Sequence, residues 1–299
     1  FYLDWAGIGA SNNNFMCYGE FTQGRGGYPN DLWIPGGIVK NGDLTKVYPV
    51  DQAKITEGVT HAWYEDTTPL HPWEGDSKPK YTGPKPPYKF LDVEKKYSFI
   101  KTPHYDGEPM EVGPLARLIV GYASGHKEIQ AAVNGVLAAL KVGPEVLFST
   151  LGRTAARAIE TQLVAHKMDE WLLALAANIN SGDYAIADND KWDPSSWPEE
   201  CSGYGWHEAT RGALGHWIVI KNGVTKNYQA VVPSTWNAAP RDEKGVRSPY
   251  EQALVGTPIA NIEQPLEILR TIHSFDPCLA CAVHVYDEKD ELKSKVKVL

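Results

Sequence analysis

The spacing of apolar residues changes about a third of the way along the chain. Residues 1–111 are rich in glycine, proline and aromatic residues, and their short apolar stretches predict short strands between turns. Apolar residues then recur at helical spacing over residues 115–140 and again over 145–180, which predicts two long helices. Pro144 suits the start of the second helix, and residues 181–183 suit its end. At 1.5 Å per residue, this helix would be on the order of 50 Å long.

The last third of the chain mixes strand and helix signals. Residues 184–200 form a loop rich in tryptophan, proline and aspartate. Asn222-Gly223 lies between alternating apolar runs at 215–220 and 224–232, which is a strong signal for a β-hairpin. A further helix is expected near residues 264–273.

These patterns together predict an α+β fold, with a core of long helices and irregular β-hairpin regions around it. We expect Arg153 and Arg157, on one face of the second long helix, to be paired or solvated rather than catalytic. The expected regions are a Gly, Pro and aromatic-rich part at 1–111, a helical bundle at 112–183, a functional region at 184–284 and a C-terminal extension at 285–299.

Composition narrows the classes of function. The chain has 299 residues, of which 42% are hydrophobic, so it can bury a sizeable core. A formal net charge of −8 argues against a nucleic-acid partner, because no basic face is available to displace phosphate counterions. No apolar run approaches the ~18 residues that suggest a membrane span. Four cysteines are too few for a disulfide scaffold, and we expect Cys17 and Cys201 to be buried free thiols.

The soft metal ligands of the chain cluster near its end. Cys278 and Cys281 are three residues apart, Asp276-Pro277 precedes them, and His284 follows. Thiolates favour nickel, copper, zinc or iron–sulfur centres over magnesium or calcium. A lone C-x-x-C pair is also compatible with half of a zinc site or with a redox dithiol. The string D-P-C-x-x-C-x-x-H is more specific, and it resembles the C-terminal signature of nickel–iron hydrogenase large subunits.

Other strings resemble the same family in the same order along the chain. Residues 207–217 are similar to the family's H-E-A-P-R-G-A-L-G-H-W stretch, although Thr210 stands where the family has proline. The remaining matching strings lie at 101–117, 149–157, 231–237 and 247–251.

The resemblance implies a role for each matching residue. Cys278 would be a terminal nickel ligand, and Cys281 would bridge nickel to an iron that carries carbon monoxide and cyanide. His284 and the main-chain carbonyl of Ala230 would bind a magnesium-type ion. Arg211 would lie over the open metal position beside Asp276, so the residues expected to act in catalysis are Arg211, Asp276, Cys278 and Cys281. The residues expected to surround the cofactor are Thr210, Arg211, Pro233 and Ser234, with Ser234 hydrogen-bonded to a cyanide ligand.

The resemblance also implies an activity and partners. The family cleaves dihydrogen heterolytically and reversibly, and it passes the electrons to an iron–sulfur small subunit. The expected location is the periplasm or a membrane surface facing it. Residues 285–299 extend beyond His284 and resemble the extension that a maturation endopeptidase removes, and the alternation at 293–299 predicts a short edge strand.

One departure from the family concerns the other half of the metal site. The family's second cysteine pair, R-x-C-G-x-C, is absent from this chain, and three of the first five residues are aromatic. We therefore expect a fragment that needs the N-terminal part of the large subunit and is inactive alone. The alternative is a non-catalytic protein, either a metal-free precursor or a metal-binding scaffold.

Overall fold

The computed structural model describes residues 5–23, 31–85, 92–278, 282–287, 289 and 291–297, without the side chains of 282–284, 296 and 297. The strands are β1 (Phe15–Cys17), β2 (Glu20–Thr22), β3 (Leu32–Ile34), β4 (Gly37–Val39), β5 (Ile55–Gly58), β6 (Thr102–Tyr105), β7 (Glu200–Ala209), β8 (Gly212–Lys221), β9 (Val224–Val231), β10 (Ala282–Tyr286) and β11 (Leu292–Lys297). The α-helices are α1 (Pro114–Ala123), α2 (Lys127–Leu140), α3 (Thr150–Asn180), α4 (Pro233–Asn237), α5 (Pro249–Leu254) and α6 (Leu266–His273). The expected mixture of helices and strands is confirmed, and the 3-10 helices are η2 (Gln52–Lys54), η3 (Pro144–Leu147) and η4 (Pro194–Ser196).

The first predicted long helix is two helices. The chain leaves α1 at Ser124 and turns at Gly125, whose φ is +80°, a value that glycine adopts without strain. The side chain of His126 then accepts a hydrogen bond from Ile129 N and caps α2. The prediction of one continuous helix over 115–140 was wrong, because this turn interrupts the main-chain hydrogen bonds while leaving the apolar spacing intact.

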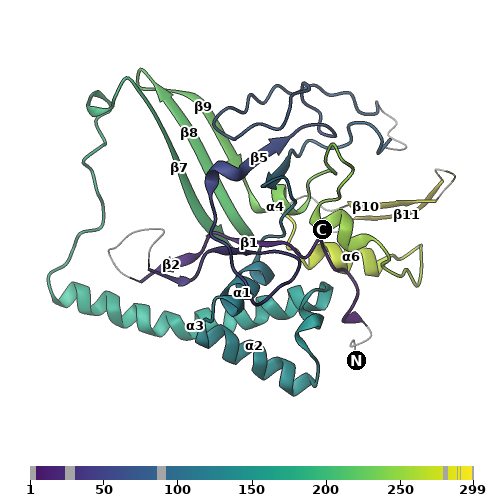
Figure 1. Ribbon diagram of the computed structural model, residues 1–299, viewed down its shortest axis with the longest axis horizontal. Coiled ribbons are helices and arrows are strands. Elements are labelled where there is room, and N and C mark those ends of the chain that lie inside the picture. Colours follow the sequence, from purple (N-terminus) through teal and green to yellow (C-terminus); the bar gives the residue numbers. More distant parts are fainter. Residues whose placement is uncertain are drawn as a thin grey trace.

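The second predicted long helix, α3, begins later than expected. Pro144 opens the separate short helix η3, and the Ser149 side chain caps α3 by accepting a hydrogen bond from Gly152 N at 3.0 Å. The helix ends at Asn180, before the predicted stop. Its 31 residues correspond to about 46 Å. Figure 1 shows α3 running along one edge of the molecule, and its far end extends beyond the helices packed against its start.

Three antiparallel strands form the largest sheet, in the order β7-β8-β9. The predicted hairpin is confirmed: Lys221 pairs with Val224, and Asn222 and Gly223 between them have φ values of +51° and +74°. The strand β7 was not predicted, and it pairs with β8 over its whole length, from Glu200–Lys221 to Ala209–Gly212.

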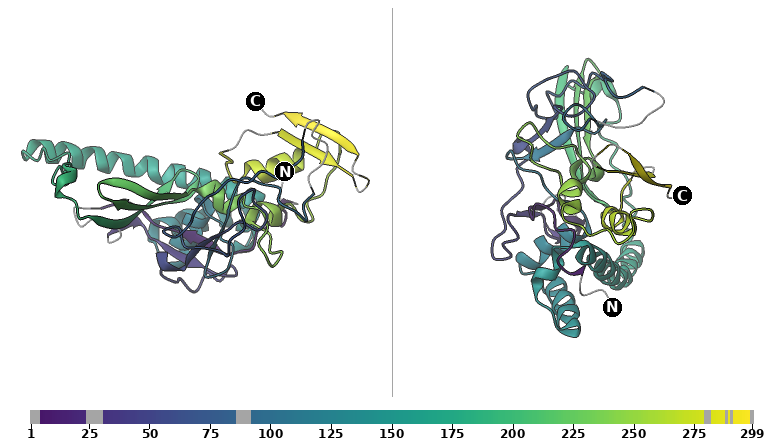
Figure 2. Two further views of the ribbon diagram at one scale, coloured as in Figure 1. Left: turned by 90° about the horizontal axis from the view of Figure 1, so that it is seen from above. Right: turned by 90° about the vertical axis from the view of Figure 1, so that its right-hand side faces the viewer.

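The core lies on both sides of β1. Phe15 and Cys17 pack with α1 and α2 in one apolar cluster, whereas Met16 and Tyr18 pack in a second cluster with Trp217 of β8. This division follows from the alternation of side chains along a strand. The helix α1 is buried over most of its length and contacts β1, α2, α3 and β8. Figure 2 shows β10 and β11 at the opposite end of the molecule from the far end of α3.

The predicted C-terminal edge strand is present as β11, which pairs antiparallel with β10. Of the helices in the described ranges, none is long and apolar enough to cross a membrane. The division of the chain into four regions remains a prediction.

Candidate functional site

The hairpin turn between β7 and β8 carries Thr210 and Arg211. Ala209 and Gly212 form the last pair of the ladder, so the turn has two residues, and both side chains are exposed. Gly212 has a φ of +128°, and a Cβ atom there would lie 2.5 Å from Gly113 N. The turn therefore packs directly on the main chain that leads into α1, and only glycine fits at this contact.

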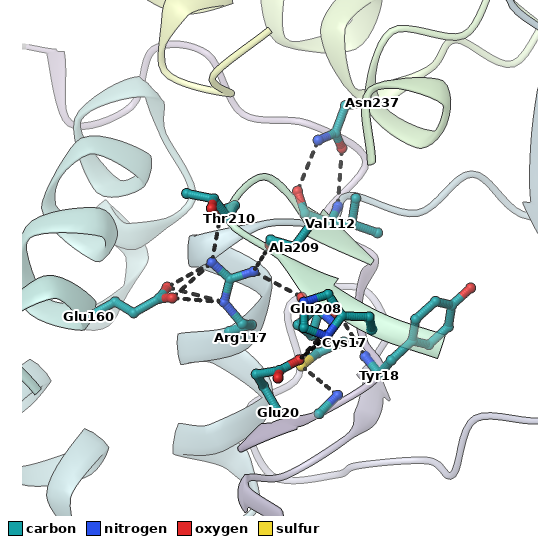
Figure 3. Close-up of polar contacts among 12 residues, drawn as sticks. Cys17, Tyr18, Glu20, Val112, Arg117, Glu160, Glu208, Ala209, Thr210 and Asn237 are labelled. Carbon is teal, nitrogen blue, oxygen red and sulfur yellow. Dashed lines mark hydrogen bonds and ion pairs between the residues drawn. The ribbon is translucent and has the colours of Figure 1, made fainter. Parts of the chain in front are cut away.

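Arg117 of α1 holds this turn from below (Figure 3). Its Nη1 donates to Ala209 O at 3.0 Å, and its Nη2 donates to Thr210 O at 3.1 Å. The same guanidinium binds Glu208 of β7 at 2.9 Å and Glu160 of α3 at 2.8–3.1 Å. A rigid planar group with five donors can connect one helix, one strand and one turn in this way, which a lysine cannot do.

Burial shifts the pKa values of the ionisable groups that pair with each other around Arg117. Burial raises the pKa of Glu208 to about 7, although Arg117 and the Tyr18 N–H, which donates to Glu208 at 2.8 Å, both favour the carboxylate. Burial alone would lower the pKa of Arg117, but the attraction of Glu208 and Glu160 outweighs it and raises that pKa. The guanidinium therefore stays charged, and Glu208 is the group in the network that can titrate near neutral pH.

Cys17 and Cys201, the two cysteines outside the C-terminal motif, differ in their surroundings. Cys17, buried beside this network, accepts a hydrogen bond from Gly19 N at 3.2 Å, and burial raises the pKa of its thiol well above the usual value. It is the buried free thiol that the sequence predicts. Cys201 is also free, but it lies partly exposed on β7, so its predicted burial was wrong. The prediction failed because β7 itself was not foreseen.

Asp276, between α6 and Cys278, is held by two arginines. Arg211 Nε donates to the main-chain oxygen of Asp276 at 2.9 Å, so the turn and this loop meet. The Asp276 carboxylate instead accepts a hydrogen bond from Arg157 Nε of α3 at 2.5 Å. Asp276 has a φ of +53° and precedes Pro277, a combination that costs on the order of 1 kcal/mol and needs support from such contacts.

Cys278 lies close to α4. Its main-chain N–H donates to Ser234 Oγ at 3.2 Å, and Ser234 is buried at the start of α4, directly after Pro233. The Asn237 side chain fixes α4 by exchanging two hydrogen bonds with the main chain of Val112, at 3.1 and 2.9 Å (Figure 3). The Cys278 side chain is exposed.

The other expected ligands are placed less fully. Ala230 lies on β9, opposite His216 of β8. Cys281 lies outside the described residues, and for His284 only the main chain in β10 is described. Among the residues that the structure describes, no three His, Cys, Asp or Glu side chains form a group that could hold a metal ion. Cys278 and Cys281 are thiol donors suited to a soft metal, and by themselves they supply only part of a site.

Sequence reasoning missed several residues that position the site. Arg117, Glu160, Glu208 and Asn237 were not singled out, and Arg157 was expected only to be paired or solvated. The available signal was the spacing along α3, because Arg153, Arg157 and Glu160 follow one another at intervals of four and three and share one face. Their partners lie 42 to 119 residues away in the sequence, so the spacing alone does not identify them.

Comparisons with known proteins identify the family of the chain. The uptake hydrogenase large subunit of Bradyrhizobium diazoefficiens is 47% identical over 312 residues, and the match covers 100% of this chain and 52% of that protein. The Hydrogenase-1 large chain of Escherichia coli K12 is 44% identical over 301 residues, with 96% and 50% covered. The solved Ni-Fe-Se hydrogenase of D. vulgaris Hildenborough in the reduced state superimposes with a TM-score of 0.72 at 32% identity, covering 93% of this chain and 54% of that one.

The chain spans about half the length of these relatives. The family model for nickel-dependent hydrogenase matches residues 1–284, which include every candidate site residue. The chain therefore belongs to the nickel-dependent hydrogenase family.

Proposed function

We propose that this chain is part of the catalytic large subunit of a nickel–iron hydrogenase, which cleaves dihydrogen reversibly and heterolytically to protons and electrons. The observation that carries the proposal is the meeting of three segments distant in sequence. Arg211 from the β7–β8 turn contacts Asp276, and Ser234 from α4 contacts the main chain of Cys278. Membership of the nickel-dependent hydrogenase family supports the same chemistry.

The chain would hold part of the metal centre. Cys278 would bind nickel as a terminal ligand, Cys281 would bridge nickel and iron, and His284 with the Ala230 carbonyl would bind a magnesium-type ion. When bound, the nickel–iron centre with its carbon monoxide and cyanide ligands supplies the place where dihydrogen is cleaved. The thiolate donors suit such soft metals, whereas a magnesium-type ion requires oxygen and water ligands beside His284.

The surrounding residues orient the reacting groups. Arg211 would stand beside the open metal position and direct its guanidinium hydrogen bonds there, and its permanent charge makes it a better orienting group than a base. The hydrogen bond from Arg211 to the Asp276 carbonyl would fix the direction in which the loop continues to Cys278. Thr210, Pro233 and Ser234 would line the iron's small ligands, with Ser234 donating its hydroxyl hydrogen to a cyanide.

The complete enzyme would need further chains. An iron–sulfur small subunit would accept the electrons, and the N-terminal part of the large subunit would supply the missing cysteine pair. The far half of α3 offers a surface for that part, with exposed Leu172 and Leu173 at 66% and 71% exposure. The enzyme would face the periplasm.

One observation supports the proposal that residues 285–299 are a removable C-terminal extension. β11, which lies beyond the region matched by the family model, pairs with β10, and Lys295 lies opposite His284. Residues 285–299 would therefore be a C-terminal extension folded against the strand that carries a metal ligand. A maturation endopeptidase would remove it after His284, once nickel is in place.

The test is the variant Arg211→Lys in the assembled enzyme, with Lys221→Ala at the distal end of β8 as a control. We expect Arg211→Lys to retain nickel and iron, measured by metal analysis, and to oxidise dihydrogen at least tenfold more slowly, because planar two-point contacts are lost. The control should match wild type in both measurements. Wild-type turnover by Arg211→Lys would contradict the proposed role of Arg211.

A second experiment separates the enzyme from the metal-free alternative. The isolated 299-residue chain, reconstituted with nickel and iron, should not sustain hydrogen-dependent dye reduction, whereas the assembled enzyme should. An assembled enzyme that binds nickel and iron without turnover would support a scaffold and would overturn the proposed activity.

A further inference from the structure

Two arginines contact Asp276 at different atoms. Arg157 Nε donates to the carboxylate oxygen Oδ2 at 2.5 Å, and Arg157 Nη2 donates to Ser274 O at 2.8 Å. Arg211 Nε donates to the Asp276 carbonyl oxygen at 2.9 Å. Among the described residues, the Arg211 side chain makes a single hydrogen bond, the one from Nε to this carbonyl oxygen. Arg157 therefore binds the carboxylate of Asp276, and Arg211 binds its main-chain carbonyl.

The position of Arg157 is fixed by the helix that carries it. One turn earlier on α3, Arg153 is bound at both ends of its guanidinium by the buried Glu111, at 2.7 and 2.9 Å. The Arg153 guanidinium also lies 3.7 Å from the centre of the Phe275 ring. The helix therefore contacts three successive residues, namely the carbonyl of Ser274, the ring of Phe275 and the carboxylate of Asp276.

This division matters because a carboxylate and a guanidinium attract each other more strongly than a carbonyl and a guanidinium. If Arg157 did not engage the Asp276 carboxylate, the Arg211 guanidinium, which already contacts the carbonyl of the same residue, could pair with it. Pairing there would draw the Arg211 guanidinium toward Asp276. Its Nη groups, which make no hydrogen bond among the described residues, would then be occupied by that carboxylate.

We propose that Arg157 is a positioning residue for the dihydrogen reaction: it engages the Asp276 carboxylate, so that Arg211 holds only the carbonyl and keeps its Nη groups for the metal site. This inference rests on the proposed function for its activity readout. Among the described residues, the Arg157 side chain donates hydrogen bonds to Asp276 and Ser274 and not to Cys278 or Ser234, so it acts through Asp276.

The test is a double-mutant cycle in the assembled enzyme, with Arg157→Ala, Asp276→Asn and the combination of the two. Arg157→Ala alone should slow hydrogen oxidation at least tenfold. Asp276→Asn should itself slow hydrogen oxidation. Adding Arg157→Ala to Asp276→Asn should slow it by less than a further twofold, because the neutral amide no longer competes for Arg211. Arg157→Lys, which retains a charge for the carboxylate, should lie closer to wild type than Arg157→Ala. Asp169→Asn, at an exposed position further along α3, should match wild type.

A second readout does not depend on turnover. The infrared stretching bands of the carbon monoxide and cyanide ligands should shift in Arg157→Ala relative to wild type and shift less in Arg157→Lys, because the charge of Arg211 would have moved. Unchanged bands in Arg157→Ala would overturn the inference. Equal losses from Arg157→Ala in the two backgrounds would also overturn it, since Arg157 would then act independently of the Asp276 carboxylate.

The two proposals fail in different ways. A metal-loaded wild-type enzyme without turnover would overturn the proposed function, and the infrared comparison would still decide the role of Arg157. If Arg157→Ala does not assemble, the cycle is run with the uncharged variant Arg157→Gln in both backgrounds. A loss in the wild-type background that disappears in the Asp276→Asn background then supports the inference, and equal losses overturn it.

Discussion

Arg153 and Glu111 form a bidentate ion pair in which both side chains are almost fully buried. The Nε–Oε1 and Nη2–Oε2 distances are 2.7 and 2.9 Å, and Arg153 Nη1 also donates to Gly9 O at 2.7 Å. The Glu111 main chain is hydrogen-bonded to Asn14 and Met16 on the N-terminal segment. The pair therefore joins α3, the segment before α1 and the first described residues of the chain.

Breaking this pair should destabilise the fold strongly. Arg153→Met leaves the Glu111 carboxylate buried without its partner, which typically costs about 3–5 kcal/mol. The exposed pair Lys221–Glu200 at 3.3 Å provides the control, since Lys221→Ala should cost less than ~1 kcal/mol. Urea unfolding followed by circular dichroism measures both free energies. A loss below ~1 kcal/mol for Arg153→Met would show that water reaches Glu111 easily.

The stability of the wild-type chain relative to Glu208→Gln should fall as pH rises from about 5 to 8. Burial raises the pKa of Glu208 to about 7 from the ordinary value of 4.5, so the folded state binds a proton that the unfolded state has lost in this range. The contribution of Glu208 to stability is fully present below the ordinary value and is lost as pH rises through the folded value.

Glu200 gives a matched control of opposite sign. The hydrogen bond and charge of Lys221 lower the pKa of this exposed carboxylate, so its contribution is present above the ordinary value and is lost as pH falls. Unfolding of wild type, Glu208→Gln and Glu200→Gln across pH 4–8 measures both effects. A wild-type curve parallel to that of Glu208→Gln would contradict the raised pKa.

Gly212→Ala should misplace the β7–β8 turn. The new Cβ atom would lie 2.5 Å from Gly113 N, and the φ of +128° is unfavourable for alanine. We expect a loss of about 1–3 kcal/mol from the strained conformation, together with reduced hydrogen oxidation, because Arg211 precedes this residue. Gly203→Ala, within β7, is the control, since nothing lies within 4 Å of its Cβ and that variant should retain its stability. Thermal unfolding and activity of the assembled enzyme distinguish these outcomes.

The far half of α3 should contact the remaining part of the large subunit. It exposes a series of large apolar side chains, which are Met168, Leu172, Leu173, Leu175 and Ile179. Leu173→Lys should weaken association at least tenfold, because a charge would have to be buried. Ala131→Lys, an exposed position on α2, should leave association unchanged. Co-purification of the two parts, followed by titration calorimetry, tests this, and equal affinities for wild type and Leu173→Lys would exclude this surface.

Local signals in the sequence predicted only part of the local structure. Asn222-Gly223 fixes its own turn, because both residues tolerate positive φ values. The break between α1 and α2 was missed although Gly125 marks it, since apolar spacing continues across the turn. The strand β7 contains Gly203 and Gly205 and few apolar residues, so it becomes a strand only through pairing with β8.

The site could be predicted only in part. Resemblance to the family selected Arg211, Asp276, Ser234 and Cys278, and the structure brings these residues into neighbouring contacts. Neither spacing nor periodicity could show that the Asp276 carboxylate is bound by Arg157, because a partner 119 residues away is set by tertiary packing. The partners of Arg117 could not be predicted either, because they lie on α3, on β7 and in the β7–β8 turn.

The two-residue turn between β7 and β8 also restricts insertions and deletions in this part of the chain. Ala209 pairs directly with Gly212, and Arg117 binds the carbonyls of both Ala209 and Thr210. One inserted codon would shift the strand register and move every following side chain of β8 to the opposite face of the sheet. Trp217 would then leave the core, where it is 1% exposed. Insertions and deletions should therefore be excluded from residues 208–212 in any functional variant, while the outer Asn222-Gly223 turn could accept them.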